Sequence, residues 1–284
     1  MKLVQITELL ANAKKNHYAV GAFNVINLEM VQAIVKAAEI EKSPIILQVY
    51  HGDLEYIGGP YIAAIAKVAA ESVSIPLALQ LDHGQNLDQI VSCINWGFSS
   101  IMIDLSSSDF QENLIHTKDV VKEAHTKGVT VEAELGLIFN GRTTVDEQKS
   151  SLTNPDLAAN FVDVTNIDAL AVSVGTAHGE YTFGPDINFD LLEKLVEVVP
   201  VPIVIHGGSF TPDKDIIKMI KMGVAKVNIG TEIMMGFIRG LKNALVYEDQ
   251  EITARKVLSN AKAHVEEIVR KKIRLLNTLR TNFG

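Results

Sequence analysis

The sequence predicts a (β/α)8, or TIM, barrel, in which eight parallel strands close into a ring that helices cover from outside. Short apolar runs of strand length alternate eight times with segments of helical periodicity. Most of these runs end in a polar residue, which is where barrel enzymes carry their chemistry. The chain has 284 residues and 47% hydrophobic content, enough for a barrel of roughly 250 residues. We therefore expect a single α/β domain over residues 1–284, with extra helices at both ends, rather than an open doubly wound sheet.

A short amphipathic helix opens the chain, because residues 5–16 place Ile6, Leu9, Leu10 and Ala13 on one face. We expect this helix to cover the bottom of the barrel. Short apolar runs bounded by glycine, proline or polar residues then predict eight strands, at residues 18–24, 44–49, 76–81, 99–104, 129–134, 168–174, 202–206 and 225–229. Amphipathic segments predict the helices that follow them, at residues 28–42, 60–72, 86–96, 111–127, 155–165, 189–198, 213–222 and 231–246. A basic helix at residues 257–276 lies outside the eightfold pattern.

The composition narrows the class of partner. A formal net charge of −8 argues against a general nucleic-acid surface, and no apolar run approaches the ~20 residues that cross a bilayer. The single cysteine, Cys93, excludes an intrachain disulfide, and the first residues lack the apolar segment of a signal peptide. We therefore expect a cytoplasmic protein that acts on a small molecule and binds neither nucleic acid nor membrane.

Polar residues end seven of the eight predicted strands. Because the carboxyl ends of barrel strands open at one mouth, this pattern gathers their side chains on a single face. The residues are Asn24, Asp82 with His83, Asp104, Glu134, His178, His206 and Asn228. The longest loop, residues 137–151, follows the fifth strand and is the best candidate for a mobile lid.

Three of these strand-end residues, His83, His178 and His206, are histidines flanked by small residues. One such histidine alone is more often a hydrogen-bonded structural residue. Three neutral imidazoles that leave an open position are a recurrent arrangement for catalytic zinc, so together they predict a zinc site. The other five histidines are interpreted as solvated side chains; they are His17, His51, His116, His125 and His264.

Asp82 stands directly before one of the predicted zinc ligands. A carboxylate at a barrel mouth near a dication can exchange a proton with a substrate hydroxyl, so we interpret Asp82 as a general acid/base. The alternative is that it only orients His83. Asp104 and Glu134 have two open interpretations, since they either support the histidines through hydrogen bonds or provide ligands for a second metal position.

Glycine-rich segments follow the seventh and eighth predicted strands. Barrels commonly bind phosphate there, through backbone amides and a helix amino terminus. We therefore predict a phosphate site in these two segments, with Gly179 as a third close approach. The residues of the two segments are Gly207, Gly208, Ser209, Asn228, Ile229, Gly230 and Thr231.

Six motifs together resemble the class II, zinc-dependent fructose-bisphosphate and tagatose-bisphosphate aldolase family, over nearly the whole chain. The motifs are YAVGAFN at 18–24, LDHG at 81–84, EAELG at 132–136, GTAHG at 175–179, HGGS at 206–209 and KVNIGTE at 226–232. The resemblance implies that His83, His178 and His206 hold one zinc ion per subunit and that Asp82 handles the C4 hydroxyl. Gly179, residues 207–209 and residues 228–231 are implied to hold the dihydroxyacetone-phosphate end, and Asn24 is expected to contact the substrate. A sodium or potassium ion is a further candidate cofactor.

The implied reaction is retro-aldol cleavage of a ketose 1-phosphate to dihydroxyacetone phosphate and an aldehyde, within carbohydrate metabolism such as glycolysis. Zinc would stabilise the enediolate charge as a Lewis acid, while Asp82 removes the C4 hydroxyl proton and the C3–C4 bond breaks. A Schiff-base lysine is the competing aldolase design, but Lys226 begins its predicted strand and does not end it. Glu232 resembles the tagatose-type branch of the family, because other branches have aspartate at this position.

Two arginines suggest a second anion at C6 of the substrate. Arg142 stands on the predicted lid where relatives carry a carboxylate, and Arg255 matches an arginine that reaches the far phosphate from a neighbouring subunit. A guanidinium suits a phosphate or sulfonate better than a neutral sugar terminus. We therefore expect a substrate of the fructose- or tagatose-1,6-bisphosphate type and a homodimer or homotetramer, with 6-deoxy-6-sulfofructose 1-phosphate as the alternative.

Other departures from the family border the aldehyde half of the expected pocket. They are Gln80, Tyr50, His51 and Phe210, and they leave the zinc and phosphate ends intact. Two further classes stay open from the sequence alone. One is a non-catalytic aldolase-like subunit, and the other is a zinc-dependent epimerase on a similar barrel.

Overall fold

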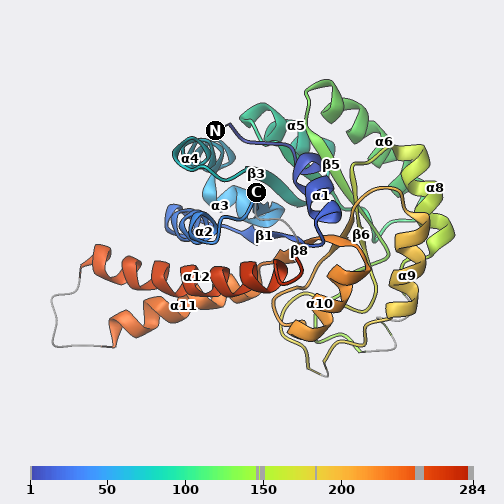
Figure 1. The fold of residues 1–284 in the computed structure, drawn as a ribbon. Helices are drawn as coiled ribbons and strands as arrows, with labels where there is room; N and C mark the ends of the chain where they lie inside the picture. Colours follow the sequence, from blue (N-terminus) through green and yellow to red (C-terminus); the bar gives the residue numbers. More distant parts are fainter. Residues whose placement is uncertain (1, 145–146, 148–150, 183, 247–252, 281–284) are drawn as a thin grey trace.

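The computed structural model describes residues 2–144, 147, 151–182, 184–246 and 253–280. Eight parallel strands close into a barrel in the order of the sequence, with β1 paired to both β2 and β8 (Figure 1). Helices lie around the outside of this ring. The predicted (β/α)8 fold is therefore confirmed.

Each strand overlaps one of the predicted apolar runs. The strands are β1 (Val20–Asn24), β2 (Ile45–Tyr50), β3 (Leu77–Gly84), β4 (Ser100–Ile103), β5 (Thr130–Leu135), β6 (Ala169–Val172), β7 (Ile203–Ile205) and β8 (Val224–Ile229). All strand residues are buried except Tyr50 and His83. This burial explains why the strands read as continuous apolar runs, since helices cover the outer face and side chains fill the interior.

Two strands end more than one residue away from their predicted positions, and each difference changes where a site residue lies. β3 reaches Gly84, three residues past its predicted end at 81, because the chain bulges and then rejoins β4. His83 lies in this bulge with φ +53°, an irregularity that commonly redirects a side chain beside an active site. β6 ends at Val172, before its predicted end at 174, so His178 lies on the following loop.

Helices follow the strands as predicted, and α8, α9 and α10 have the predicted bounds. The helices are α1 (Ile6–Lys15), α2 (Leu28–Ile40), α3 (Leu54–Ile57), α4 (Gly59–Ser72), α5 (Leu87–Trp96), α6 (Phe110–Thr126), α8 (Pro155–Thr165), α9 (Phe189–Val198), α10 (Asp213–Met222), α11 (Thr231–Leu245) and α12 (Ala254–Leu276). Side-chain caps, which satisfy amides of the first turn, fix many of the starts. The capping residues are Asn27, Asn86, Asp109, Asn154, Asn188 and Thr253. The short helix α3 and the 3₁₀ turn before it, η1 (His51–Asp53), were not predicted.

The helix α1 closes the amino-terminal end of the barrel, as predicted. Its residues Ile6, Leu9, Leu10 and Ala13 are buried in one apolar cluster with inward-facing residues of the strands. The strand members are mostly small and are Val20, Ala22, Ile46, Ala78, Met102, Ala169, Ala171, Val204 and Ala225. The lower half of the barrel is therefore filled with side chains, and polar groups lie above it.

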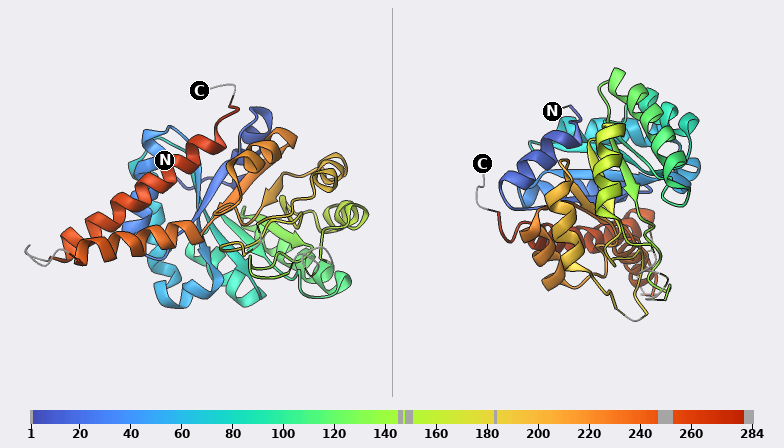
Figure 2. Two further views of the ribbon diagram at one scale, coloured as in Figure 1. Left: turned by 90° about the horizontal axis from the view of Figure 1, so that it is seen from below. Right: turned by 90° about the vertical axis from the view of Figure 1, so that its right-hand side faces the viewer.

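The last two helices form a pair that extends away from the barrel (Figure 2). α12 has 23 residues, which corresponds to about 35 Å, and it packs against α11 and α2. Glu41, which follows α2, pairs with Arg270 at 2.7 Å and Arg274 at 2.9 Å. This is the predicted carboxyl-terminal helix outside the eightfold repeat.

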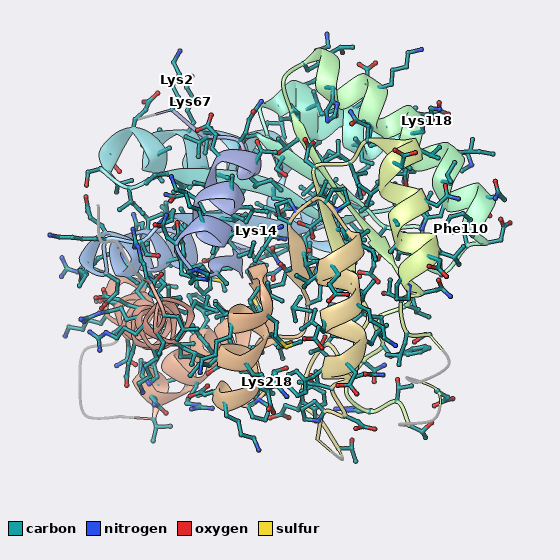
Figure 3. The ribbon with its side chains drawn as sticks, turned by 45° about the vertical axis from the view of Figure 1, so that its right-hand side comes forward. Lys2, Lys14, Lys67, Phe110, Lys118 and Lys218 are labelled. Carbon is teal, nitrogen blue, oxygen red and sulfur yellow. The ribbon has the colours of Figure 1, made fainter. Side chains whose placement is uncertain are left out.

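Lys118 and Lys218 lie far apart on the outside of the molecule (Figure 3). In the described ranges, every helix is too short or too polar to span a membrane.

Candidate active site

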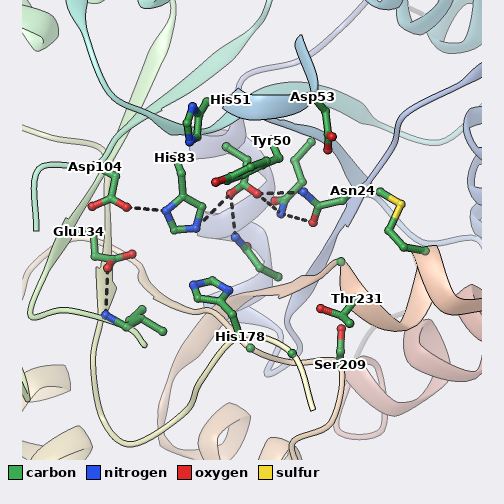
Figure 4. A pocket seen from close by; sticks show the side chains of 18 of the residues that line it. Asn24, Tyr50, His51, Asp53, His83, Asp104, Glu134, His178, Ser209 and Thr231 are labelled. Carbon is green, nitrogen blue, oxygen red and sulfur yellow. Dashed lines mark hydrogen bonds and ion pairs between the residues drawn. The ribbon is translucent and has the colours of Figure 1, made fainter. Parts of the chain in front are cut away.

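A cavity of about 540 Å³ opens at the carboxyl ends of the strands. It gathers most of the predicted strand-end residues in one place (Figure 4). The residues that line it are Asn24, Gln48, Tyr50, His51, Asp53, Asp82, His83, Gln85, Asp104, Glu134, Leu137, Ile138, His178, Gly179, Gly207, Ser209, Asn228, Gly230, Thr231 and Met234. The predicted mouth is thus one continuous site.

The three predicted histidines converge at this cavity, His83 from the end of β3, His178 from the loop after β6 and His206 from the end of β7. The ring centroid of His83 lies 5.1 Å from that of His178 and 4.8 Å from that of His206. His83 Nε2 and His206 Nδ1 are 3.1 Å apart. Two zinc–nitrogen bonds at a tetrahedral angle would place their nitrogens about 3.3 Å apart. One ring nitrogen of each histidine lies within 4.8 Å of the others, so the set has the dimensions of a metal site.

Carboxylates hold two of these rings from behind. Asp104 Oδ2 lies 2.6 Å from His83 Nδ1, and Glu132 Oε1 lies 3.2 Å from His206 Nε2. Each contact favours the tautomer that has its proton on the outer nitrogen, which leaves the inner nitrogen with a free lone pair. Histidines that bind metal are commonly oriented in this way. Asp104 therefore makes the hydrogen bond that one of its two interpretations, support of a histidine, requires.

Glu132 belongs to a buried network that the sequence did not reveal. Lys226 Nζ lies 2.7 Å from Glu132 Oε2, and Gln80 Nε2 donates to the same oxygen at 3.0 Å. Burial opposes ionisation of Glu132, but Lys226 and His206 outweigh it and lower its pKa to about 2. Lys226 is fully buried by this pairing and is therefore no free amine for a Schiff base.

The charge distribution suits a dication. Burial and the neighbouring imidazoles lower the pKa of His178 to about 3, and burial lowers the pKa of His206 as well. Burial also opposes a proton on His83, but Asp82, Asp104 and Glu134 raise its pKa to about 10. These carboxylates favour positive charge at the centre of the cluster. His178 and His206 are thus neutral imidazoles, and the carboxylates around His83 supply the negative charge that a bound dication requires, so that a metal ion would take the place of the His83 proton.

Asp82 is held by three side-chain amides. Its Oδ2 accepts from Asn24 Nδ2 at 2.9 Å and from Gln48 Nε2 at 3.2 Å, while Oδ1 accepts from Asn228 Nδ2 at 3.3 Å. Burial raises the pKa of Asp82, but His83, His206, Lys226 and the Asn24 amide together lower it below its usual range. Asp82 is thus an ionised, oriented carboxylate that faces the cavity.

Gln48 was missed by the sequence analysis, although it supplies the polar residue of the one strand that lacked a predicted one. It lies inside the apolar run of β2, one residue before Val49. A single amide within such a run resembles an ordinary core position. The signal available was its register, because Gln48 pairs directly with Asn24 of β1.

A second group of ligand type consists of His83, Asp104 and Glu134. Burial and the charge of Asp104 raise the pKa of Glu134 to about 8, and Glu134 Oε2 has no hydrogen-bond partner among the described residues. Asp104 also accepts from Ser106 Oγ at 2.7 Å. The geometry therefore keeps the second metal position open as an interpretation.

The predicted phosphate segments meet at one end of the cavity. Gly179 and Gly207 have φ values of +79° and +76°, and a Cβ on Gly207 would come within 2.2 Å of the carbonyl oxygen of Ala177. Only glycine fits this close approach. Gly230 and Thr231 form the start of α11, whose first amides face no helical partner. This end has the form of an anion site built from backbone.

Side chains from β2 and η1 form another part of the lining. Tyr50 stacks edge-on against His51, with ring centroids 4.4 Å apart, and Asp53 lines the same cavity. His51, expected both as a solvated histidine and as a residue that borders the aldehyde half of the pocket, is half-buried and lines the cavity, because the 3₁₀ turn after β2 brings it there (Figure 4). His125, by contrast, lies outside the lining and contacts Asp168.

Several predicted site residues lie outside the lining. His206 is fully buried behind it, and Ile229 is buried in β8. Arg142 and Arg255 are both exposed. Of the predicted lid, Leu137 and Ile138 line the cavity and Gly141 contacts the His178 backbone, whereas residues 145–146 and 148–150 lie outside the described residues.

Comparisons with known proteins agree with this geometry. The family model for "Fructose-bisphosphate aldolase class-II" matches residues 4–280. The chain is 39% identical to the "Probable fructose-bisphosphate aldolase" of Bacillus subtilis, covering 96% of this chain and 97% of that protein. It is 38% identical to the fructose-bisphosphate aldolase of Staphylococcus aureus, over 98% of both chains. Among solved structures, the YdjI aldolase of Escherichia coli K12 superposes with a TM-score of 0.86 at 32% identity, over 96% of this chain and 97% of that one.

Proposed function

We propose a zinc-dependent reaction for this chain, which belongs to the class-II fructose-bisphosphate aldolase family. Membership makes the protein an aldolase, a carbon–carbon lyase that acts on a sugar phosphate. The proposal adds the roles of individual residues and the type of substrate. We also propose that residues 1–284 form one domain and that a neighbouring subunit completes its site.

The cluster of His83, His178 and His206 carries the proposal. Three imidazoles at metal-binding distance, two of them oriented by Asp104 and Glu132, fit zinc with one open position. When bound, zinc supplies a Lewis acid that stabilises the negative charge of an enediolate. Glu134 provides a second position, and Na+ or K+ remains the candidate for a further ion.

Asp82 acts as the general base for cleavage. It takes the proton of the C4 hydroxyl while the C3–C4 bond breaks, and the bonding electrons pass to C3 as the C4–O bond becomes a carbonyl. The amides of Asn24, Gln48 and Asn228 fix the direction of its carboxylate, and His83, His206 and Lys226, with the Asn24 amide, keep its pKa low. In the condensation direction the same group returns the proton.

The backbone end of the cavity binds the C1 phosphate. Gly179, Gly207, Gly208 and Ser209 approach from the loops after β6 and β7, and the segment Asn228–Thr231 approaches from β8 and the start of α11. Asn24 links this end to Asp82. The substrate is therefore a ketose 1-phosphate, and one product is dihydroxyacetone phosphate.

The far end of the substrate carries a second anion at C6. Among the described lining residues there is no lysine or arginine, so this anion requires a cation from elsewhere. Arg142 and, from a neighbouring subunit of a homodimer or homotetramer, Arg255 supply it; both side chains are exposed. Fructose- or tagatose-1,6-bisphosphate fits this description, and 6-deoxy-6-sulfofructose 1-phosphate is the alternative with the same chemistry.

The test is a panel of ketose 1-phosphates with a coupled triose-phosphate assay, run on protein whose zinc content has been measured. We expect one zinc per subunit and triose phosphate from a substrate with a C6 anion. An epimerised product without triose phosphate would contradict the aldolase assignment for this chain. Protein that binds no zinc and stays inactive after zinc addition would instead indicate a non-catalytic subunit.

A further inference from the structure

Lys272, near the carboxyl end of α12, lies against the proposed phosphate site although it is distant in sequence. Its Nζ donates to the carbonyl oxygens of Ser209 at 3.0 Å and of Gly208 at 3.3 Å. It also lies 2.9 Å from Glu232 Oε2, in the first turn of α11. The side chain is buried. One lysine therefore joins the loop after β7 to the helix after β8.

These contacts fix the direction of two peptide groups. In a trans peptide the N–H and C=O bonds point in opposite directions. With the carbonyls of Gly208 and Ser209 directed at Lys272, the amides of Ser209 and Phe210 point away from it. Neither amide donates a hydrogen bond to another of the described residues. Both are thus available to an anion on the other side of the loop.

Lys272 also balances a charge beside that loop. Glu232 places a carboxylate in the first turn of α11, and its backbone amide donates to Ser209 Oγ at 3.2 Å. An uncompensated carboxylate there would repel a phosphate at the same helix terminus. Because the described lining contains no lysine or arginine, the ammonium behind the loop is the compensating charge.

We propose that Lys272 is a positioning residue for the C1 phosphate, which orients the loop amides of Ser209 and Phe210 and neutralises Glu232. This inference rests on the proposed function, since it takes that loop as the phosphate site. Lys272 does not line the cavity, so it acts through the loop and not on the reacting atoms. Its effect is on phosphate affinity more than on bond cleavage.

The experiment compares Lys272→Met with Lys271→Met. Lys271 is the neighbouring lysine on the same helix, 70% exposed and paired with Glu267, so it controls for loss of a charge. We expect Lys272→Met to weaken binding of dihydroxyacetone phosphate to the zinc-loaded protein by about tenfold, as for loss of a charged hydrogen-bond donor. KM should rise by a similar factor, with kcat and zinc content close to wild type. Lys271→Met should match wild type.

A second substitution separates positioning from general stability. Adding Glu232→Gln to Lys272→Met removes the unpaired carboxylate and should restore part of the affinity, whereas a purely structural role predicts no recovery. If Lys272→Met does not fold, Glu232→Gln alone decides, because it should tighten dihydroxyacetone-phosphate binding; unchanged or weaker binding would overturn the inference.

The outcomes also separate this inference from the function beneath it. Wild-type protein that neither binds dihydroxyacetone phosphate nor forms triose phosphate would remove the proposed function and the inference together. Wild-type protein that does both, with Lys272→Met equal to Lys271→Met, would overturn the inference alone.

Discussion

The two ends of the cavity are lined by different groups, with backbone at one end and side chains at the other. At the end formed after β6, β7 and β8, glycines such as Gly179 and Gly207 bring backbone close to the cavity, and the start of α11 adds amides. At the end formed by β2 and η1, the lining consists of the side chains of Tyr50, His51 and Asp53. Backbone amides suit any phosphate, while side chains vary with the molecule they meet. The first end is therefore expected to bind the group that substrates of this reaction share, and the second end is expected to select among substrates.

The largest expected effect concerns the histidine cluster, on which both ends depend. Replacing His83, His178 or His206 by alanine removes one of three ligands and should lower zinc affinity by more than about 100-fold, since loss of only a supporting partner costs 10–100-fold. Activity should fall with zinc content. Metal analysis and steady-state rates on the same preparations check this.

Folding should survive these histidine substitutions, which circular dichroism can establish. His125→Ala is a matched control, because this histidine lies outside the cavity and contacts Asp168. Full zinc and full turnover in any one of the three variants would remove that residue from the ligand set.

The next effect concerns Asp82, which lies between the two ends. Asp82→Ala should keep zinc bound and slow carbon–carbon cleavage by about 10²–10⁴-fold, the usual range for a lost acid/base. Single-turnover rates measured with zinc-saturated protein test this. A variant that lost zinc but kept its rate per bound zinc would make Asp82 an orienting residue for His83.

A smaller effect is expected beneath the cluster, at Glu132. Glu132→Gln leaves Lys226 buried without its anion, which should lower the free energy of unfolding by about 3–5 kcal/mol. It also removes the carboxylate that contacts His206 Nε2 and should lower the affinity for zinc by about 10–100-fold. Denaturant unfolding and zinc titration measure the two effects separately. If Glu132→Gln were as stable as the wild type, burial of Lys226 would not depend on its ion pair with Glu132.

The smallest effect tests the proposed binding of the C6 anion, which would select among substrates. Arg142→Ala and Arg255→Ala should each lower kcat/KM for a substrate with a C6 anion by about 1–3 kcal/mol, as for loss of a charged hydrogen-bond partner. A ketose 1-phosphate without that anion should be scarcely affected. Equal losses on both substrates would reject the proposal that these two arginines bind the C6 anion.

The fold was predictable because each element repeats a simple local pattern. The eight apolar runs located every strand, and the amphipathic segments at α8, α9 and α10 have the predicted bounds. The alternation of strand and helix leaves few topologies, so the barrel followed. The lining around Asp82 and His83 was also predictable, since polar residues at strand ends stand out against apolar runs.

Residues inside the runs were not predictable in the same way. Gln48, Glu132 and Lys226 lie within strands and are buried, and a lone polar residue there gives no sign of the partner that satisfies it. The 3₁₀ turn that positions His51 was not predictable, because it has no apolar period. Lys272 reads as one more basic residue of an amphipathic helix. In each case the missing information was a contact between segments far apart in the sequence.

The apolar cluster that fills the barrel beneath the mouth has a kinetic consequence. In the described part of the chain, α1 and the small inward residues close the lower end of the barrel, so substrate and products pass through the opening at the carboxyl ends of the strands. An aldolase makes two molecules from one, and both share that route. In the proposed binding mode the aldehyde has no backbone cradle and is expected to leave first, so that dihydroxyacetone phosphate is the product expected to compete with the next substrate molecule.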